Sequence, residues 1–312
     1  MKKLVVLIVA CFCALSCTEN TMMSSLKKPG EYSASGKACL VETWTFEDYD
    51  AELQVQENGP STWQRVIKVI PRNVSGKLPA VVVPFYFPEA MLGFQPGTGE
   101  VLPKYKGVEM MLHLAKRGIA SVSGESYHLT YLESEKSRDD FSRWQDAGEQ
   151  LNRDYPEWSG MGKLVADCRL LIDLMEDDPR IDGSRIGIAG HSLGGKVAYY
   201  TGCLDSRVKV ILASDFGLLW EQSNWEKCWY WGDKLEILKT EGLDNLSLFA
   251  ECGGKPFCLI AGQYDDERSN EAVKSSAVFS PETFLFVNHA SGHRPPQWAL
   301  DEGYDFMEKY LK

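Results

Sequence analysis

The sequence predicts an α/β fold built on a doubly wound, mostly parallel sheet. From about residue 36 onward, short apolar runs typical of buried strands alternate with segments of helical spacing. The alternation continues to the end of the chain with no internal repeat and no low-complexity block, so residues 36–312 are expected to form one domain. In such a sheet, active residues are expected at the carboxyl ends of the strands.

Apolar runs and helical spacing place the elements in order. Strands are expected at 40–46, 63–70, 78–83, 119–123, 185–189, 208–213, 257–261 and 283–287, and helices at 107–117, 139–152, 164–175, 196–203, 267–275 and 297–311. In the third helix the apolar residues recur on one face over three turns, which is typical of a helix packed on a core. Two segments interrupt the alternation, at 127–156 and after Asp215, and are expected to be lid-like insertions above the sheet.

The first 16 residues have the features of a secretory signal peptide. Lys2 and Lys3 precede an apolar run, 4–15, that is too short to span a bilayer. The run ends in Ala-Leu-Ser-Cys, which resembles a bacterial lipoprotein signal with Cys17 as the lipidated residue, although Ala14 stands where Leu is usual. An ordinary cleaved signal is the alternative. Both predict export; the first adds a lipid anchor on a bacterial membrane, periplasmic or at the cell surface, with residues 17–35 as a tether.

The charge and the cysteine content limit which binding partners and which cysteine sites are expected. A net charge of −11 argues against nucleic acid and against a basic patch lying on anionic lipid, so membrane contact is expected only through the anchor on Cys17. An exported chain can pair some of its later cysteines, which are Cys39, Cys168, Cys203, Cys228, Cys252 and Cys258. None shows C-x-x-C spacing, so neither a structural zinc nor a redox motif is expected.

The stretch Gly190-His191-Ser192-Leu193-Gly194 is the most specific motif of the chain. A Gly-x-Ser-x-Gly pattern between a strand and a helix is typical of a sharp turn that exposes the serine oxygen as a nucleophile. Glycines two residues either side leave room for the close approach of strand and helix. The sequence therefore predicts Ser192 as a catalytic nucleophile.

A serine nucleophile needs a base and a group that orients the base. His293 lies in the loop between the last expected strand and the last expected helix and is the favoured base, with His289 in the same loop as the alternative. For the acid, Asp265 directly follows the strand at 257–261, and Asp215, after the strand at 208–213, is the main alternative. Asp266 is expected to cap a helix, and His191 to have a packing role.

The order Ser192, Asp265, His293 and the stretch 178–195 resemble the α/β-hydrolase superfamily, in particular its dienelactone hydrolase and acetyl xylan esterase-like branch. The resemblance covers residues 36–312 and implies an acyl-enzyme mechanism with no metal and no cofactor. It also implies an oxyanion hole made by the N–H of Leu193 and a donor from the loop 84–88. That loop contains Pro84 and Pro88, so its donor is a backbone N–H of residues 85–87 or the Tyr86 hydroxyl.

Aromatic residues suggest the kind of ester. Phe85 and Phe87 are expected to line the substrate pocket. The insertion after Asp215 is rich in tryptophan, and its candidate residues are Trp225, Trp229 and Trp231. These side chains are expected either to stack on sugar rings or to form the insertion's own core. Lys196, four residues after the nucleophile, resembles a lysine of glucuronoyl esterases, with a solvated helix lysine as the alternative. The sequence thus predicts an exported carbohydrate esterase acting on a small-molecule or polysaccharide ester. A peptidase of the same fold and a non-catalytic glycan-binding protein are the alternatives.

Overall fold

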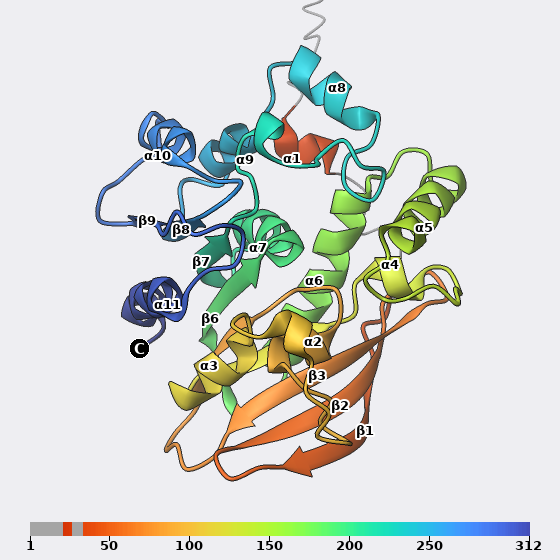
Figure 1. Ribbon diagram of the computed structural model, residues 1–312, viewed down its shortest axis with the longest axis vertical. Helices are drawn as coiled ribbons and strands as arrows, with labels where there is room; N and C mark the ends of the chain where they lie inside the picture. Colours follow the sequence, from red (N-terminus) through yellow and green to blue (C-terminus); the bar gives the residue numbers. More distant parts are fainter. Residues whose placement is uncertain (1–20, 27–33) are drawn as a thin grey trace, which may run out of the picture.

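The computed structural model describes residues 21–26 and 34–312. Within them a nine-stranded sheet has the order β1-β2-β3-β5-β4-β6-β7-β8-β9 (Figure 1). The strands are β1 (Ala38–Thr45), β2 (Tyr49–Glu57), β3 (Trp63–Pro71), β4 (Leu78–Val82), β5 (Ala120–Gly124), β6 (Ile181–His191), β7 (Val208–Ser214), β8 (Phe257–Ala261) and β9 (Phe284–Asn288). From β5 to β9 along the sheet all pairs are parallel, which confirms the α/β prediction.

Helices cover both faces of this parallel part. On one face α6 (Gly160–Glu176) packs beside α7 (Leu193–Leu204), and on the other α3 (Met110–Lys116) and α11 (Gln297–Leu311) lie together through the ion pair of Arg117 with Asp301. Every residue of β4, β5 and β8 is buried between these layers. Continuous apolar strands are what a sheet covered on two faces requires.

The first strands are antiparallel, and one of them was missed from the sequence. β2 pairs with β1 and β3, and β3 pairs antiparallel with β5. The buried positions of β2 include the polar residues Glu52, Gln54 and Gln56. Because the buried face of this strand is not apolar, its sequence lacks the alternation of apolar and polar residues by which a strand is predicted. Ion pairs compensate: Lys68 contacts Glu52 at 3.4 Å and Arg180 contacts it at 2.6 Å.

The expected insertions are helical. The first contains α4 (Tyr127–Thr130) and α5 (Phe141–Asp154), and the second contains η3 (Trp220–Gln222), α8 (Lys234–Thr240) and α9 (Asn245–Glu251). Figure 1 shows α5 and α8 beyond the carboxyl end of the sheet. The remaining elements are α2 (Pro88–Leu92), η2 (Pro103–Tyr105) and α10 (Glu267–Lys274).

Part of the expected tether is folded against the domain. α1 (Met22–Ser25) packs on α9, with Met22 and Leu26 buried, and the Met22 N–H donates to Glu251 Oε1 at 2.8 Å. The interpretation of 17–35 as a tether therefore does not hold for residues 21–26. The expected signal peptide, 1–16, and Cys17 lie outside the described residues.

Candidate active site

Ser192 stands at a sharp turn between β6 and α7. Its backbone has φ 58° and ψ −119°, a region that costs a non-glycine residue energy and is found where a side chain must be aimed. A Cβ on Gly190 would lie 2.1 Å from the Gly194 carbonyl oxygen, and a Cβ on Gly194 would lie 2.1 Å from the Pro84 carbonyl oxygen. The glycines are therefore required by close backbone approaches, and the turn predicted from the motif is present.

His293 lies between β9 and α11, as the sequence predicted, and pairs with a buried carboxylate. Its Nδ1 is 2.6 Å from Asp215 Oδ2. The Asp215 side chain has no exposed surface, whereas the His293 side chain is 32% exposed. An ionised carboxylate only accepts hydrogen bonds, so Nδ1 donates and the neutral ring presents Nε2 as its proton acceptor.

The loop after β8 surrounds the other oxygen of Asp215. Oδ1 accepts four backbone N–H groups at 2.8–3.1 Å, from Gly262, Gln263, Tyr264 and Asp265. Burial acts to raise the pKa of Asp215, but the hydrogen bond from His293 and those from the backbone outweigh it and lower the pKa below its usual value. Asp215 is thus held as a carboxylate beside the imidazole.

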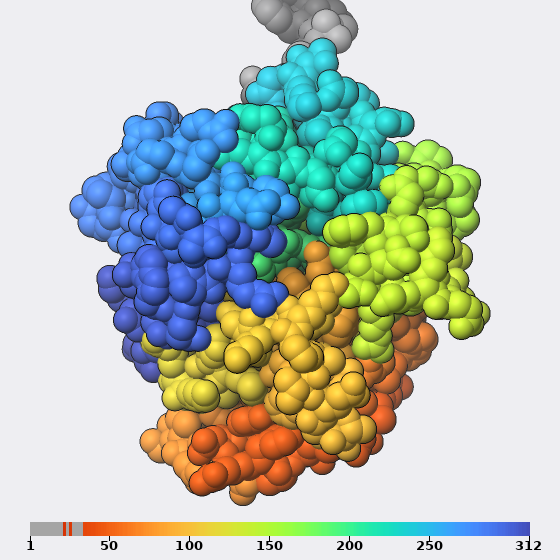
Figure 2. Space-filling model, viewed as in Figure 1, coloured from red at the N-terminus to blue at the C-terminus, as the bar shows by residue number. Residues whose placement is uncertain are grey.

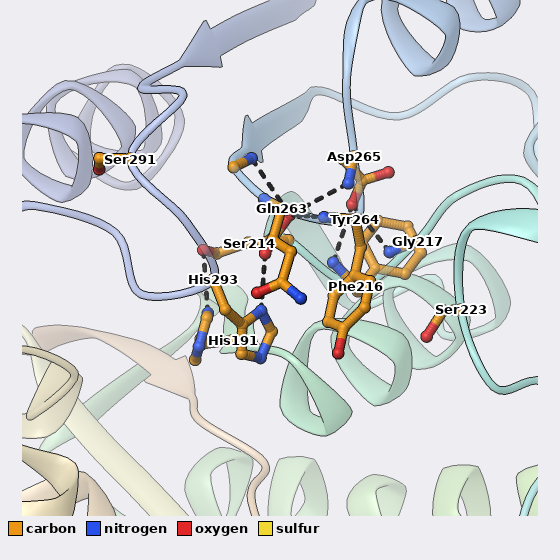
Figure 3. Close-up of polar contacts among 12 residues, drawn as sticks. His191, Ser214, Phe216, Gly217, Ser223, Gln263, Tyr264, Asp265, Ser291 and His293 are labelled. Atoms are coloured by element: carbon orange, nitrogen blue, oxygen red, sulfur yellow. Dashed lines mark hydrogen bonds and ion pairs between the residues drawn. The ribbon is translucent and has the colours of Figure 1, made fainter.

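Asp265, the acid favoured from the sequence, does not orient His293. Its Oδ2 accepts the N–H groups of Phe216 and Gly217, both at 2.8 Å, and its Oδ1 accepts from the Leu218 N–H at 2.7 Å and the Ser269 hydroxyl at 2.9 Å (Figure 3). These partners turn the carboxylate toward the loop after β7. The expected pairing of Asp265 with His293 is wrong, and the alternative, Asp215, has that position. Asp266 caps α10, as expected.

The other histidines of the neighbourhood have supporting contacts. His191 is buried, its ring centroid is 4.5 Å from that of His293, and its Nδ1 lies 3.2 Å from Ser214 Oγ (Figure 3). Burial, with a smaller effect of His293, lowers the pKa of His191 to about 3, so this ring is neutral and packs against the candidate base. His289, the alternative base, has its Nδ1 2.7 Å from Ser291 Oγ instead.

Two donors expected for an oxyanion lie at the nucleophile. Burial raises the pKa of the Tyr86 hydroxyl and outweighs an interaction with the Ser192 side chain that acts to lower it, which keeps the phenol protonated. Leu193 is the first residue of α7, so its N–H is one of the donors that a helix leaves unpaired at its N-terminus. Their role toward an oxyanion stays a prediction.

The aromatic residues expected to contact substrate are mostly covered. Trp225, Trp229 and Trp231 are 0–4% exposed. Trp225 Nε1 donates to the Gly217 carbonyl at 2.7 Å, and Trp231 Nε1 to the Tyr200 hydroxyl at 3.2 Å. The three tryptophans are core residues rather than an exposed stacking surface, so of the two roles expected for them the structure favours the packing role.

Phe85 and Phe87 are likewise buried, against the edge of Tyr105. Phe85 therefore offers little surface to a substrate, contrary to the expectation, whereas Phe87 lines a groove beside it.

Lys196 is buried, not solvated. Its Nζ donates to the Phe216 carbonyl at 2.8 Å and the Ser223 hydroxyl at 2.7 Å, and lies 3.7 Å from the centre of the Trp225 ring. Burial lowers the pKa of Lys196 well below its usual value. The lysine thus fastens the segment that follows Asp215 to the helix that follows Ser192.

Two neighbours of the site were not found from the sequence. Trp144 on α5 packs its ring 4.3 Å from that of Tyr86, and Tyr264 presents itself edge-on to His293 with centroids 4.9 Å apart. Neither residue belongs to a recognisable motif, although Trp144 lies in the segment 127–156 that was expected to be an insertion above the sheet. In Figure 2 the surface is hollowed where the yellow, light green and blue segments meet.

In 21–26 and 34–312, no group of three or more His, Cys, Asp or Glu side chains is arranged to hold a metal ion. All six cysteines of that part are free thiols. Over the same residues, no helix has the length and apolar character needed to cross a bilayer.

Known structures share this architecture. A glucuronoyl esterase from Solibacter usitatus superimposes with a TM-score of 0.62 at 11% identity, over 94% of this chain and 95% of that one. Acetyl xylan esterase 1 from Thermoanaerobacterium sp. JW/SL YS485 gives 0.63 at 15% identity, over 92% of both chains. This protein has the α/β-hydrolase fold. The resemblance to that superfamily, noted from the motif, is thereby confirmed at the level of the fold.

Sequence comparison adds a likeness that covers only part of the chain. No family model matches the chain. The Bacillus subtilis protein described as "Putative hydrolase YtaP" is 25% identical over 164 residues, which are 48% of this chain and 54% of that protein. The match thus spans about half the length of the curated relative.

Proposed function

We propose that this α/β-hydrolase-fold protein is an exported serine esterase that cleaves carboxylic esters of carbohydrates through Ser192, His293 and Asp215. The observation that carries the proposal is the 2.6 Å contact between His293 and the buried carboxylate of Asp215, in a fold whose nucleophile turn holds Ser192 at φ 58°. A passive serine has no need of a strained turn or of an oriented imidazole.

The proposed reaction proceeds in two halves. Ser192 Oγ attacks the ester carbonyl while His293 Nε2 takes its proton, and Asp215 stabilises the imidazolium. The Leu193 N–H and the Tyr86 hydroxyl stabilise the tetrahedral oxyanion, and His293 then protonates the leaving alcohol. Water, deprotonated by the same histidine, attacks the acyl-enzyme and releases the acid and Ser192.

A carbohydrate ester is proposed for the substrate because fold neighbours include acetyl xylan and glucuronoyl esterases. Export rests on the sequence of residues 1–17, with Cys17 as the proposed lipid anchor and a bacterial membrane as its location.

Labelling with a fluorophosphonate tests the nucleophile. We expect the wild-type protein and Ser184→Ala, a control at an exposed position of β6, to be labelled, and Ser192→Ala to remain unlabelled with activity reduced by at least about 10³-fold. Acetylated, feruloylated and methyl-glucuronate sugars then test the class of ester. Equal labelling of Ser192→Ala and wild type would contradict the proposal.

A further inference from the structure

A groove of about 390 Å³ lies near Tyr86, because two of its lining residues, Tyr105 and Asp139, interact electrostatically with the Tyr86 hydroxyl. Its lining includes Phe87, Lys104, Tyr105, Ser137, Arg138 and Asp139, and it is called the Phe87 groove below. It lies between the segment that follows α2 and the loop that precedes α5. Its volume is within the range of small-molecule sites.

The Phe87 groove is connected to the catalytic residues on two sides. Phe87 directly follows Tyr86, whose hydroxyl interacts with the Ser192 side chain. On the other side Arg294, next to His293, donates to the backbone carbonyls of Lys104 and Lys106. The loop that forms one wall of the groove is thus fastened to the loop of the base. A ligand chain that leaves Ser192 past Tyr86 would enter this groove.

Arg138 is held rigidly at the groove. Its guanidinium lies 5.2 Å from the centre of the Phe87 ring and 3.4 Å from both Glu89 Oε2 and Glu125 Oε1. The two carboxylates are 1% and 9% exposed, whereas the Arg138 side chain is 39% exposed. A guanidinium has five N–H donors in a fixed plane, more than these contacts use. Arg138 therefore offers preoriented donors to a ligand.

The polar groups of the groove occur as donor and acceptor pairs. Lys104 forms an ion pair with Asp139, and the Ser137 hydroxyl donates to the same carboxylate at 2.5 Å. Such a lining matches hydroxyl groups, which both donate and accept, better than it matches a strong anion. The net charge of −11 also disfavours a polyanionic ligand.

We propose that the Phe87 groove binds the neutral, hydroxyl-rich sugar chain that carries the scissile ester, with Arg138 as a specificity-determining residue that donates hydrogen bonds to it. This inference rests on the proposed esterase function and extends it from the ester bond to the neighbouring sugar units. It predicts that catalytic efficiency depends on the length of the sugar chain that carries the ester.

The test compares p-nitrophenyl acetate with acetylated xylo-oligosaccharides of increasing length. We expect the wild-type kcat/KM to rise with length, and Ser137→Trp, which fills the groove from an exposed position, to raise KM for the long substrates about five- to tenfold, as does Arg138→Ala. The loss of kcat/KM should be larger for the long substrates than for p-nitrophenyl acetate, which does not extend into the groove. Arg153→Ala, an exposed arginine on α5 outside the groove lining, is the matched control.

Failure of this inference is distinct from failure of the esterase proposal. If p-nitrophenyl acetate is hydrolysed but neither chain length nor Ser137→Trp changes KM, the groove assignment is wrong and the esterase stands. Calorimetry with unmodified xylo-oligosaccharides and Ser192→Ala protein gives a readout without turnover. Binding that Ser137→Trp abolishes supports the groove, and absence of binding overturns it.

Discussion

The loops after β7 and β8 each carry a buried aspartate that accepts backbone N–H groups, yet only the first contacts a histidine. Asp215 holds four N–H groups of the β8 loop and the His293 ring, whereas Asp265 holds three N–H groups of the β7 loop and the Ser269 hydroxyl. Each carboxylate therefore fixes the loop that carries the other. The pair shows that a carboxylate at the end of a strand can orient a catalytic histidine, as proposed for Asp215, or hold a neighbouring loop in place, as Asp265 does.

Backbone conformation separates the two roles. Asp215 has φ 45°, outside the usual range for its residue type, and its side chain reaches His293. Asp265 has no such conformation and is directed into the neighbouring loop. Their environments also differ, because hydrogen bonds lower the pKa of Asp215, whereas burial raises that of Asp265. We expect the two residues to respond very differently to the same substitution.

Asp215→Asn should produce the largest effect. A neutral amide of the same shape cannot stabilise the imidazolium and does not fix its tautomer, so kcat should fall by about 10³- to 10⁴-fold with little change in KM. The measurement is steady-state hydrolysis of p-nitrophenyl acetate. Asp266→Asn, at the exposed cap of α10, is the matched control and should retain activity. A loss below about tenfold for Asp215→Asn would remove Asp215 from the mechanism.

Asp265→Asn should act mainly on stability. Its amide nitrogen would face backbone N–H donors in a site that is 1% exposed, which leaves donors unpaired and lowers the free energy of unfolding by about 2 kcal/mol. Activity of the folded fraction should fall by less than about tenfold, because Asp215 and His293 keep their contact. Urea unfolding and kinetics on the same preparation separate these effects. A loss of kcat equal to that of Asp215→Asn, with unchanged stability, would reverse the roles assigned here.

The fold and the nucleophile were predictable because local sequence determines them. Apolar runs such as that of β4 and the glycines around Ser192 follow from burial and from close backbone approach, and neither needs knowledge of distant residues. The acid was not predictable, since Asp215 and Asp265 both follow a strand. The choice depends on which side chain the tertiary structure turns toward His293, and φ at Asp215 leaves no mark in the sequence.

Composition was a poor guide to exposure in the insertion after Asp215. Its tryptophans are dense enough to suggest a sugar-binding surface, but a segment that leaves the sheet needs an apolar core of its own, and Trp225 and Trp231 supply it. Lys196 was misjudged for a related reason. A lysine on a helix is usually solvated, but here the insertion covers it and places an aromatic ring over its ammonium group.

Lys196→Met gives the smallest and most selective effect, because Lys196 binds the β7 loop through the Phe216 carbonyl while its charge interacts with Asp265. Burial lowers the pKa of this lysine, so at pH values between that pKa and 10.5 the unfolded chain binds more protons than the folded one, and the free energy of unfolding rises with pH there. Methionine removes this contribution, and the slope of the free energy of unfolding against pH, measured by urea unfolding, should be smaller than in wild type.

The loss of the hydrogen bond from Lys196 to the Phe216 carbonyl should lower kcat by only about fivefold. Lys239→Met, on the exposed side of α8, should leave both slope and kcat unchanged. If the slope is the same in Lys196→Met and in wild type, titration of Lys196 does not contribute to the pH dependence of the free energy of unfolding.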